Sequence, residues 1–546
     1  MRFADRRFLV AALLAMLLLL PSSLAIARQE AAAPLAEVLP GQRASVESIA
    51  ETLSAYRIEA AVDEAAGTVA GTATVTWRNP ADVALSEVWF RLFPNAGYYG
   101  EGGLAVGEAT VDGQPATTGL ALEDTALRVD LPEPVAPGGT ATLVLPFVAT
   151  VPADSRGSYG IFQRDSGSGT WIMAGWHPTL AVYDPGPDGG WNLAPPTSAG
   201  DPTYAASSLF DVSLRAPAGW RVVSSGAAVA AEDADGSTVH RIVAGPAREF
   251  TLVLDADFAV AEAVAEAMPG APSEGGAAIP ASPAVATPIA GETTLVRAWG
   301  EPGTDPAALE RAAESAASAL EAFGERFGPY PFAELDLVET DLDGALAVSW
   351  AGVVFLDADA MLAGSAANDP VAFDTVVAHE VAHLWWGALV GTDSNSHPWV
   401  NEGLATVSSL GYWLWEDDAD AAEASLDRWV LGPARSLLAR GDAVVDLPIG
   451  GDADPSIRSW ATYGKAALGF LAIRAEIGDE AFWSALAAVD DDWRFGIAQP
   501  ADFLAAFEAE SGADLSPLWD GWFAAADMTA EEIEAVAVSY LAETRP

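Results

Sequence analysis

Two histidines and a glutamate lie within one five-residue stretch, His379-Glu380-x-x-His383. On a helix, residues four apart differ by about 40° around the axis, so the two imidazoles point into one space. Glu380 lies about 100° from His379, where its carboxylate can hold a water beside a shared metal. A second glutamate, Glu402, follows His383 after eighteen intervening residues. Two imidazoles, one carboxylate, a free position for water and a nearby base are the requirements of hydrolytic zinc. We therefore predict one zinc ion per chain, held by His379, His383 and Glu402, with Glu380 as the base.

A helix must position the two histidines. Asp369 and Pro370 supply an N-cap and a residue suited to the first turn, apolar residues follow at helical spacing, and Gly391 can end the helix. The alternative is a buried helix whose histidines are satisfied by hydrogen bonds. That alternative leaves Glu380 and Glu402 unexplained in apolar surroundings, so the spacing favours a metal site.

The chain that precedes this helix alternates between apolar and polar residues with a period of two. Residues 72–77 and 210–215 alternate between apolar and polar, whereas 143–145 and 250–254 are more apolar and indicate more buried strands. Gly, Pro and Asp clusters separate these runs. We predict an N-terminal domain of antiparallel β-sheets over residues 54–258.

Two composition changes follow this β-rich region. Residues 259–293 are rich in Ala, Pro, Glu and Gly, which predicts a disordered insertion or linker. Beyond it, we expect strands at 294–299, 334–339 and 353–356, and a helix that opens at Asp305-Pro306 and runs to about Phe327. A small mixed sheet with helices packed on it is the predicted catalytic domain, residues 294–546.

The first residues have the features of a secretory signal. Three arginines precede an apolar run at 8–20, and Ala25-Ile26-Ala27 offers a small-residue cleavage site. The run is short for a membrane span, so we predict a signal peptide at 1–27, a linker at 28–53 and a secreted or extracytoplasmic protein. An uncleaved anchor is the alternative, and no stable membrane span is expected after cleavage.

Composition narrows the possible partners. The chain has no cysteine, which excludes disulfides and thiol chemistry, and its 26 basic and 77 acidic residues give a net charge of −51. Such a charge argues against nucleic acid and against anionic membrane surfaces. A peptide or protein substrate is the expected partner.

Three motifs together resemble the aminopeptidase N family of gluzincin zinc metallopeptidases. They are the 379–383 stretch with its spacing to Asn401-Glu402-Gly403, the segment Phe-Gly-Pro-Tyr-Pro-Phe at 327–332, and Tyr-Gly-Lys-Ala at 463–466, similar to the family's Y-x-K-G. The resemblance covers roughly residues 54–525, as in a short form without the large C-terminal helical domain.

This resemblance implies an α+β multidomain fold in which a thermolysin-like mixed α/β catalytic domain follows the β-rich domain. It implies the same three zinc ligands, with Glu380 taking a proton from the attacking water and Tyr463 donating a hydrogen bond to the oxyanion. The alternative for Tyr463 is a core tyrosine on an apolar helix. Lys465, the only lysine in the sequence, favours the family's assignment.

One position departs from the family pattern. Members carry a G-x-M-E-N-like or G-G-M-E-Y-P-like strand whose glutamate grips the substrate's α-amine, and the corresponding stretch at 346–352 puts Ser349 there. A hydroxyl cannot supply the charge-assisted hydrogen bond that selects an ammonium group. Glu339, Asp341 and Asp343 lie nearby in sequence and are the candidate substitutes.

The favoured function is an exported zinc metallopeptidase, aminopeptidase N-like. Ser349 motivates a second hypothesis, a zinc endopeptidase or a hydrolase of N-blocked peptides. A third is a binding or scaffold protein that retains the fold, against which the intact Glu380 and Tyr463 both argue. Catalytic zinc usually has three protein ligands, so we place His397 on a loop and not in the metal site.

Overall fold

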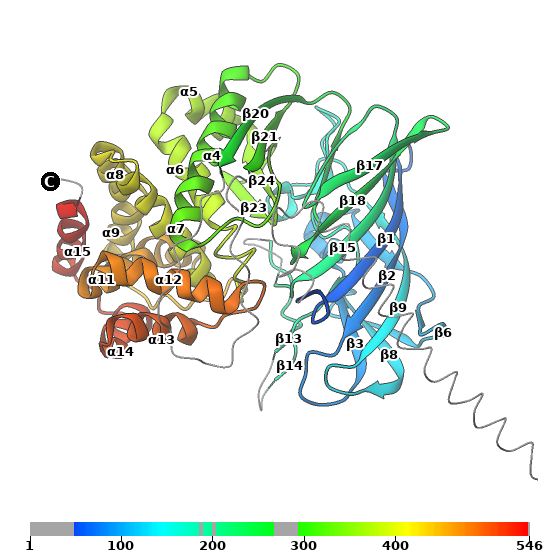
Figure 1. Cartoon of the computed structure of the whole chain (residues 1–546), viewed down its shortest axis with the longest axis horizontal. Helices are drawn as coiled ribbons and strands as arrows, with labels where there is room; N and C mark the ends of the chain where they lie inside the picture. Colours follow the sequence, from blue (N-terminus) through cyan, green and yellow to red (C-terminus); the bar gives the residue numbers. More distant parts are fainter. Residues whose placement is uncertain (1–48, 185–188, 199–203, 267–292, 544–546) are drawn as a thin grey trace, which may run out of the picture.

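The computed structural model describes residues 49–184, 189–198, 204–266 and 293–543 of the chain. A β-rich half comes first in sequence, and a small sheet covered by helices follows it (Figure 1). This arrangement confirms the predicted α+β multidomain fold. The predicted signal peptide and most of the predicted linker at 28–53 lie outside the described residues. Among the helices that are described, none has the length and apolar character needed to cross a bilayer.

The N-terminal half consists of three main sheets and one short strand pair. Its strands are β1 (Ser54–Asp63), β2 (Thr68–Arg78), β3 (Leu85–Arg91), β4 (Gly103–Val106), β5 (Thr110–Val111), β6 (Gln114–Pro115), β7 (Thr118–Ala121), β8 (Ala126–Val135), β9 (Thr140–Thr150), β10 (Phe162–Arg164), β11 (Trp171–Met173), β12 (Thr179–Leu180), β13 (Tyr183–Asp184), β14 (Gly190–Trp191), β15 (Ser208–Pro217), β16 (Arg221–Ser224), β17 (Ala227–Ala234), β18 (Ser237–Ala247) and β19 (Leu252–Asp255). The largest sheet has the order β17-β18-β15-β1-β2-β9-β5-β6, with β4 also paired to β9. The orders of the other two are β12-β3-β8-β7 and β10-β11-β19-β16.

The prediction of purely antiparallel sheets is wrong at one pair. Strands β1 and β15 run parallel, with Ser54 opposite Ser208 and Ile58 opposite Val212. Parallel neighbours need a long crossover, and the chain between β1 and β15 builds most of the other strands before it returns. Ile58 and Val212 are fully buried, so this pair lies in the middle of the N-terminal core.

The sheet of the C-terminal half has five strands in the order β20-β21-β22-β24-β23. These are β20 (Ala259–Glu266), β21 (Thr293–Gly300), β22 (Glu334–Thr340), β23 (Ala347–Trp350) and β24 (Val353–Asp357). The pairs β21–β22 and β22–β24 are parallel, whereas β20–β21 and β23–β24 are antiparallel. The predicted mixed sheet and its three predicted strands are therefore confirmed. Strand β23, which carries Ser349, forms an edge of the sheet.

Strand β20 corrects the prediction of disorder over its eight residues. Ala261, Ala263 and Ala265 alternate toward the alanine-rich helix α4 (Pro306–Phe327), and Ala265 is buried. Alanine fills a narrow gap between a strand and a helix, so a run with little apolar bulk still forms an ordered edge strand. The rest of the predicted insertion, 267–292, lies outside the described residues.

The remaining helices cover the sheet and extend from it (Figure 1). They are α5 (Ala366–Asn368), α6 (Pro370–Ala382), α7 (Pro398–Trp415), α8 (Ala419–Ser425), α9 (Gly432–Ala439), α10 (Pro455–Ser459), α11 (Ala466–Ile477), α12 (Asp479–Trp493), α13 (Pro500–Ser511), α14 (Ser516–Trp519) and α15 (Ala530–Glu543), with π-helical turns at η4 (Ala358–Ser365), η5 (Leu426–Leu431), η6 (Trp460–Lys465) and η7 (Asp520–Ala524). Helix α4 begins as predicted, since the Asp305 side chain accepts a hydrogen bond from the Ala307 N–H.

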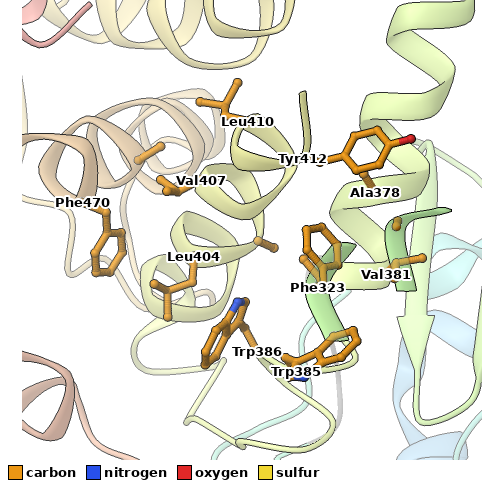
Figure 2. Packing of buried hydrophobic residues seen from close by; sticks show 14 of the residues in the cluster. Phe323, Ala378, Val381, Trp385, Trp386, Leu404, Val407, Leu410, Tyr412 and Phe470 are labelled. Carbon is orange, nitrogen blue, oxygen red and sulfur yellow. The ribbon is translucent and has the colours of Figure 1, made fainter. Parts of the chain in front are cut away.

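Helix α6 begins where the sequence predicts and ends earlier. The Asp369 side chain caps it, but the helix ends at Ala382 and not at Gly391. Immediately beyond it, Trp385 and Trp386 turn into the core, where Figure 2 shows them beside Phe323 from α4. Beyond the helix end both indoles are buried, and their N–H groups donate to the Gly328 carbonyl and to the Ser408 hydroxyl, respectively.

Candidate metal centre

Helices α6 and α7 pack against each other and contribute to one buried apolar cluster, part of which Figure 2 shows with Val381 from α6 and Leu404 from α7. This packing brings His379 and His383 of α6 opposite Glu402 of α7. The Nε2 atoms of the two histidines are 3.1 Å apart, and each lies 3.3 Å from Glu402 Oε2. The structure therefore brings all three predicted ligands to one point.

The size of this triangle fits a zinc ion. Ligand atoms held at about 2.0 to 2.1 Å from a tetrahedral zinc are about 3.3 to 3.4 Å from one another. The three atoms already lie 3.1 to 3.3 Å apart without any change of rotamer. His379, His383 and Glu402 would hold the ion, and its fourth side would face the cavity that these residues line.

Neighbouring groups set the protonation of two of these ligands, His383 and Glu402. The Nδ1 atom of His383 lies 3.2 Å from the Trp386 carbonyl, so a proton on Nδ1 leaves Nε2 free to bind metal. Burial raises the pKa of the Glu402 carboxyl, but the charge of His383 and the hydrogen bonds from both histidines outweigh burial and lower that pKa below its usual range. Glu402 is thereby kept as a carboxylate.

Glu380 is buried and lines the same cavity as the three ligands. The Ser349 hydroxyl donates toward its carboxylate, with Oγ 2.6 Å from Oε2, and Oγ is also 2.8 Å from the Glu380 carbonyl oxygen. Ser349 thus contacts the predicted base directly. Ser349, which was predicted to contact the substrate, therefore also orients Glu380.

Tyr463 lies on the π-helical turn η6 and lines the same cavity as Ser349. Its ring centroid is 6.1 Å from that of His379, and the side chain is 37% exposed. A tyrosine that is exposed to this extent and lines the cavity beside His379 is not a core tyrosine, which was the alternative assignment.

The only lysine anchors this turn. Lys465 is fully buried, and its ammonium donates to Asp442 Oδ2, the Ala443 carbonyl and the Ala525 carbonyl, each at 2.8 Å. The three partners satisfy all three ammonium N–H groups. Lys465 therefore fixes η6 from behind while Tyr463 faces the cavity.

The cavity has a volume of about 620 Å³ and extends between β23, α6, α7 and η6. Glu380 and Glu402 are the only carboxylates among its described lining residues. The three candidate substitutes for the missing glutamate lie elsewhere. Glu339 accepts hydrogen bonds from the Glu301 N–H and the Thr304 hydroxyl, Asp341 pairs with Arg156, and Asp343 does not line the cavity.

The remaining histidines have structural surroundings. His397 precedes α7, and its Nδ1 lies 2.6 Å from Asp446 Oδ1, outside the ligand triangle as predicted. His177 is buried among aromatic rings, and this burial lowers its pKa to about 4. His240 lies on strand β18.

Two residues of the N-terminal half lie beside this centre, and the sequence patterns did not indicate either of them. Arg248 is buried, and its guanidinium donates to the carbonyls of Gly387, Leu389, Ala205 and Gly496. Glu249 is buried beside it and accepts a hydrogen bond from the Ala351 N–H at 2.8 Å. A charged pair inside the apolar run from Ala247 to Leu254 was the available signal.

Comparisons with known proteins agree with this geometry. Residues 311–522 match the family described as "Peptidase family M1 domain". The chain is 30% identical over 218 residues to Aminopeptidase M1 of Arabidopsis thaliana, which is 38% of this chain and 24% of that protein. It is 26% identical over 220 residues to Tricorn protease-interacting factor F2 of Thermoplasma acidophilum, which is 38% of this chain and 27% of that protein. The matched part thus spans about a quarter of either relative.

Solved structures share the fold over most of the chain. An M1 zinc metallopeptidase mutant from Deinococcus radiodurans superposes with a TM-score of 0.60 at 18% identity, over 87% of this chain and 95% of that one. The same mutant bound to a Tyr-Ser-Ala substrate gives a TM-score of 0.61 over the same shares, also at 18% identity. At this identity the likeness shows the fold, which includes both the β-rich and the helical halves.

Proposed function

Because residues 311–522 belong to the peptidase family M1, we propose that the chain is a zinc-dependent metallopeptidase that hydrolyses peptide bonds. The observation that carries the proposal is the triangle of His379, His383 and Glu402, with Glu380 and Tyr463 facing the same cavity. This set contains a metal site, a base and an oxyanion donor. The names of the relatives and of the solved structures support the same activity for this chain.

The protein groups divide the reaction between them. A zinc ion at this site supplies Lewis-acid activation of a water molecule and of the substrate carbonyl. Glu380 accepts the proton from the attacking water and is placed to return it to the leaving amine. Ser349 holds the Glu380 carboxylate in one orientation through its 2.6 Å hydrogen bond. The Tyr463 hydroxyl donates to the oxyanion that develops on the carbonyl oxygen.

We place this activity outside the cytoplasm. Residues 1–27 combine an arginine-containing start, an apolar run and a small-residue cleavage site, which supports export. The excess of acidic residues is suited to a peptide or protein substrate and not to nucleic acid.

A second candidate function follows from Ser349. Among the described residues of the main cavity, Glu380 and Glu402 are the only carboxylates. An internal or N-blocked peptide would therefore give up no ion pair that a free N-terminus could form with a further carboxylate there. A zinc endopeptidase is therefore the alternative specificity. A scaffold role, the third hypothesis, gives no reason for Glu380, Ser349 and Tyr463 to converge on an accessible cavity.

A panel of peptides tests the proposed function. The zinc-loaded protein is incubated with free and N-acetylated peptides, and products are identified by mass spectrometry. We expect hydrolysis that a chelator abolishes and added zinc restores, because the water and the carbonyl depend on the metal. Absence of hydrolysis across the panel by protein with one zinc per chain would favour the scaffold hypothesis.

Tyr463→Phe is expected to lower kcat by about 10²- to 10³-fold, the usual cost of losing one oxyanion donor. KM should change little, since this contact forms mainly in the transition state. Steady-state kinetics on one peptide give both constants. Tyr412→Phe is the matched control, because its hydroxyl contacts Ser318 on α4 and lies outside the cavity. A normal kcat in Tyr463→Phe would remove this tyrosine from the chemistry.

A further inference from the structure

Two arginines line the main cavity, the space of about 620 Å³ that the three metal ligands also line. They are Arg428 on the π-helical turn η5 and Arg458 on the short helix α10. The other charged or titratable acid and base groups among the described lining residues are Glu380, Glu402 and the two histidines of the triangle, besides the Tyr463 hydroxyl. The proposed mechanism uses these groups and neither arginine. The cavity therefore contains positive charge that the chemistry does not require.

Arg428 is neutralised by a neighbouring carboxylate. Its Nη1 lies 2.6 Å from Asp369 Oδ2, and its guanidinium carbon is 4.9 Å from the ring centroid of Trp429. Asp369 is not among the residues that line the cavity. The ion pair leaves Arg428 with little net charge to offer a ligand.

Arg458 is not neutralised in this way. Its Nη1 lies 3.5 Å from the Pro448 carbonyl oxygen, a distance beyond the usual range of an N–H···O bond, and no carboxylate of the described residues forms an ion pair with it. Asp454, on the same helix, uses its carboxylate to cap α10 by accepting from the N–H groups of Ser456 and Ile457. Arg458 is half-buried, so its nearly unused guanidinium is available to a ligand in the cavity.

Arg458 also lies close to the reacting groups. Helix α10 continues directly into η6, so Arg458 precedes Tyr463 by five positions on one continuous helix. This separation is roughly 7 Å along the helix axis, and both side chains line the same cavity. An extended peptide advances about 3.3 to 3.4 Å per residue. A group bound by Arg458 therefore lies within a few residues of the bond that is cleaved.

We propose that Arg458 binds a carboxylate of the substrate and thereby selects peptides that carry one near the cleaved bond. This inference rests on the proposed peptidase function and specifies its substrate class. A guanidinium presents its N–H groups in a planar fork that matches the two oxygens of a carboxylate. The chain uses this fork elsewhere, since Arg241, Arg297 and Arg311 each donate through Nε and Nη2 to both oxygens of one aspartate. Two sources offer the same chemistry, an Asp or Glu side chain and the C-terminal carboxylate of a short peptide.

The charge of the whole chain makes such a selection a local effect. With a net charge of −51, the long-range field of the protein disfavours acidic peptides. At an ionic strength of about 0.15 M, interactions between exposed charges are largely screened beyond about 8 Å. A preference for acidic peptides under these conditions would therefore report a contact in the cavity and not a general attraction.

The first test measures kcat/KM at that ionic strength for two series of alanine hexapeptides. In one series the C-terminus is amidated and each position in turn is Glu or Gln, and in the other hexa-alanine has a free or an amidated C-terminus. Mass spectrometry identifies the cleaved bond. We expect the peptide with the carboxylate to be preferred about 10-fold in one series, the lower end for a hydrogen bond to a charged group, because Arg458 is only half-buried. Equal rates throughout both series would overturn the proposal.

Two substitutions of Arg458 assign the preference to this side chain. Arg458→Gln should remove it, because the amide carries no charge. Arg458→Glu should reverse it, so that Lys is preferred over Gln at the same position, or the amidated over the free C-terminus. A reversed preference requires a folded cavity, which makes this variant its own check on folding. Persistence of the original preference in Arg458→Gln would overturn the assignment.

Arg428→Gln is the matched control. It removes the same charge from the same cavity, but from an arginine that Asp369 already neutralises. The preference for the carboxylate should therefore remain about 10-fold. Equal losses in Arg428→Gln and Arg458→Gln would mean that the total charge of the cavity selects the substrate, and would overturn the role of Arg458.

A binding measurement separates this inference from the proposed function. Calorimetry uses zinc-loaded Glu380→Gln protein, in which turnover is suppressed, and the same two peptide series. The peptide with the carboxylate should bind about 10-fold more tightly than its neutral counterpart, and adding Arg458→Gln should abolish the difference. Any binding of the carboxylate to zinc is common to both proteins and cancels. Equal binding would overturn the role of Arg458 and keep the metallopeptidase, whereas absence of all hydrolysis by the unchanged protein would overturn the peptidase and leave the binding ratio to decide the role of Arg458.

Discussion

Glu380→Gln is expected to lower kcat about 10²- to 10⁴-fold, the typical contribution of a general base. The amide cannot accept the proton of the attacking water, so the chemical step slows while the metal stays in place. The Ser349 hydroxyl can still donate to the amide oxygen, as it does to Glu380 Oε2 at 2.6 Å. The fold and the zinc content should therefore match those of the unchanged protein. Steady-state kinetics, elemental analysis and circular dichroism together check the expectation.

The control for this substitution is Glu325→Gln. Glu325 is an exposed residue near the end of α4 that pairs with Arg326, and its loss of charge should leave kcat unchanged. Retention of more than about a tenth of the original rate by Glu380→Gln would contradict the assignment of the base. Another acceptor would then have to take the proton.

His383→Ala should abolish both zinc binding and hydrolysis. The triangle loses one of its three corners, and two protein ligands do not make a closed tetrahedral site. Changes that only disturb the surroundings of a ligand already weaken metal affinity about 10- to 100-fold, so loss of the ligand itself should exceed that range. Elemental analysis after dialysis should fall from one zinc per chain to almost none.

Thermal unfolding gives a second readout for the same variant. Zinc at 100 times its Kd would stabilise the native protein by about 2.7 kcal/mol, so added zinc should raise Tm. His383→Ala should show no such rise. His397→Ala is the control, since this histidine lies near Glu402 in sequence but binds Asp446 outside the triangle. Loss of zinc from the control, with retention by His383→Ala, would exchange the two assignments.

The parts of the site that could be predicted are those with local causes. The cap at Asp369 and the four-residue spacing of the histidines depend only on one helix and its geometry, so both can be predicted from the local sequence. Glu402 follows because its own helix is also marked in sequence. Tyr463 and Lys465 needed the family resemblance, since nothing in their spacing to His379 specifies a contact. Local signals thus account for most of the metal centre.

The parts that could not be predicted depend on contacts between distant segments. Helix α6 ends at Ala382, and beyond it Trp385 and Trp386 pack edge-on against Phe323 and Phe327 of α4, a tertiary contact that a local glycine signal does not contain. Glu249 reaches Ala351 from 102 residues away in sequence. The composition of strand β20 is typical of a linker, but its alanines pack against α4 in an ordered strand. Each case is a tertiary contact that overrides a local pattern.

The burial of Lys465 leaves the folded protein without an accessible side-chain amine, because no other lysine exists in the sequence. Amine-reactive labels and lysine-specific proteases can act on this side chain only when η6 opens and releases the ammonium from Asp442. Such opening also displaces Tyr463, which lies two residues away on the same turn. The rate at which Lys465 is modified therefore measures how often the catalytic turn unfolds locally, at a single chemical position and without an introduced probe.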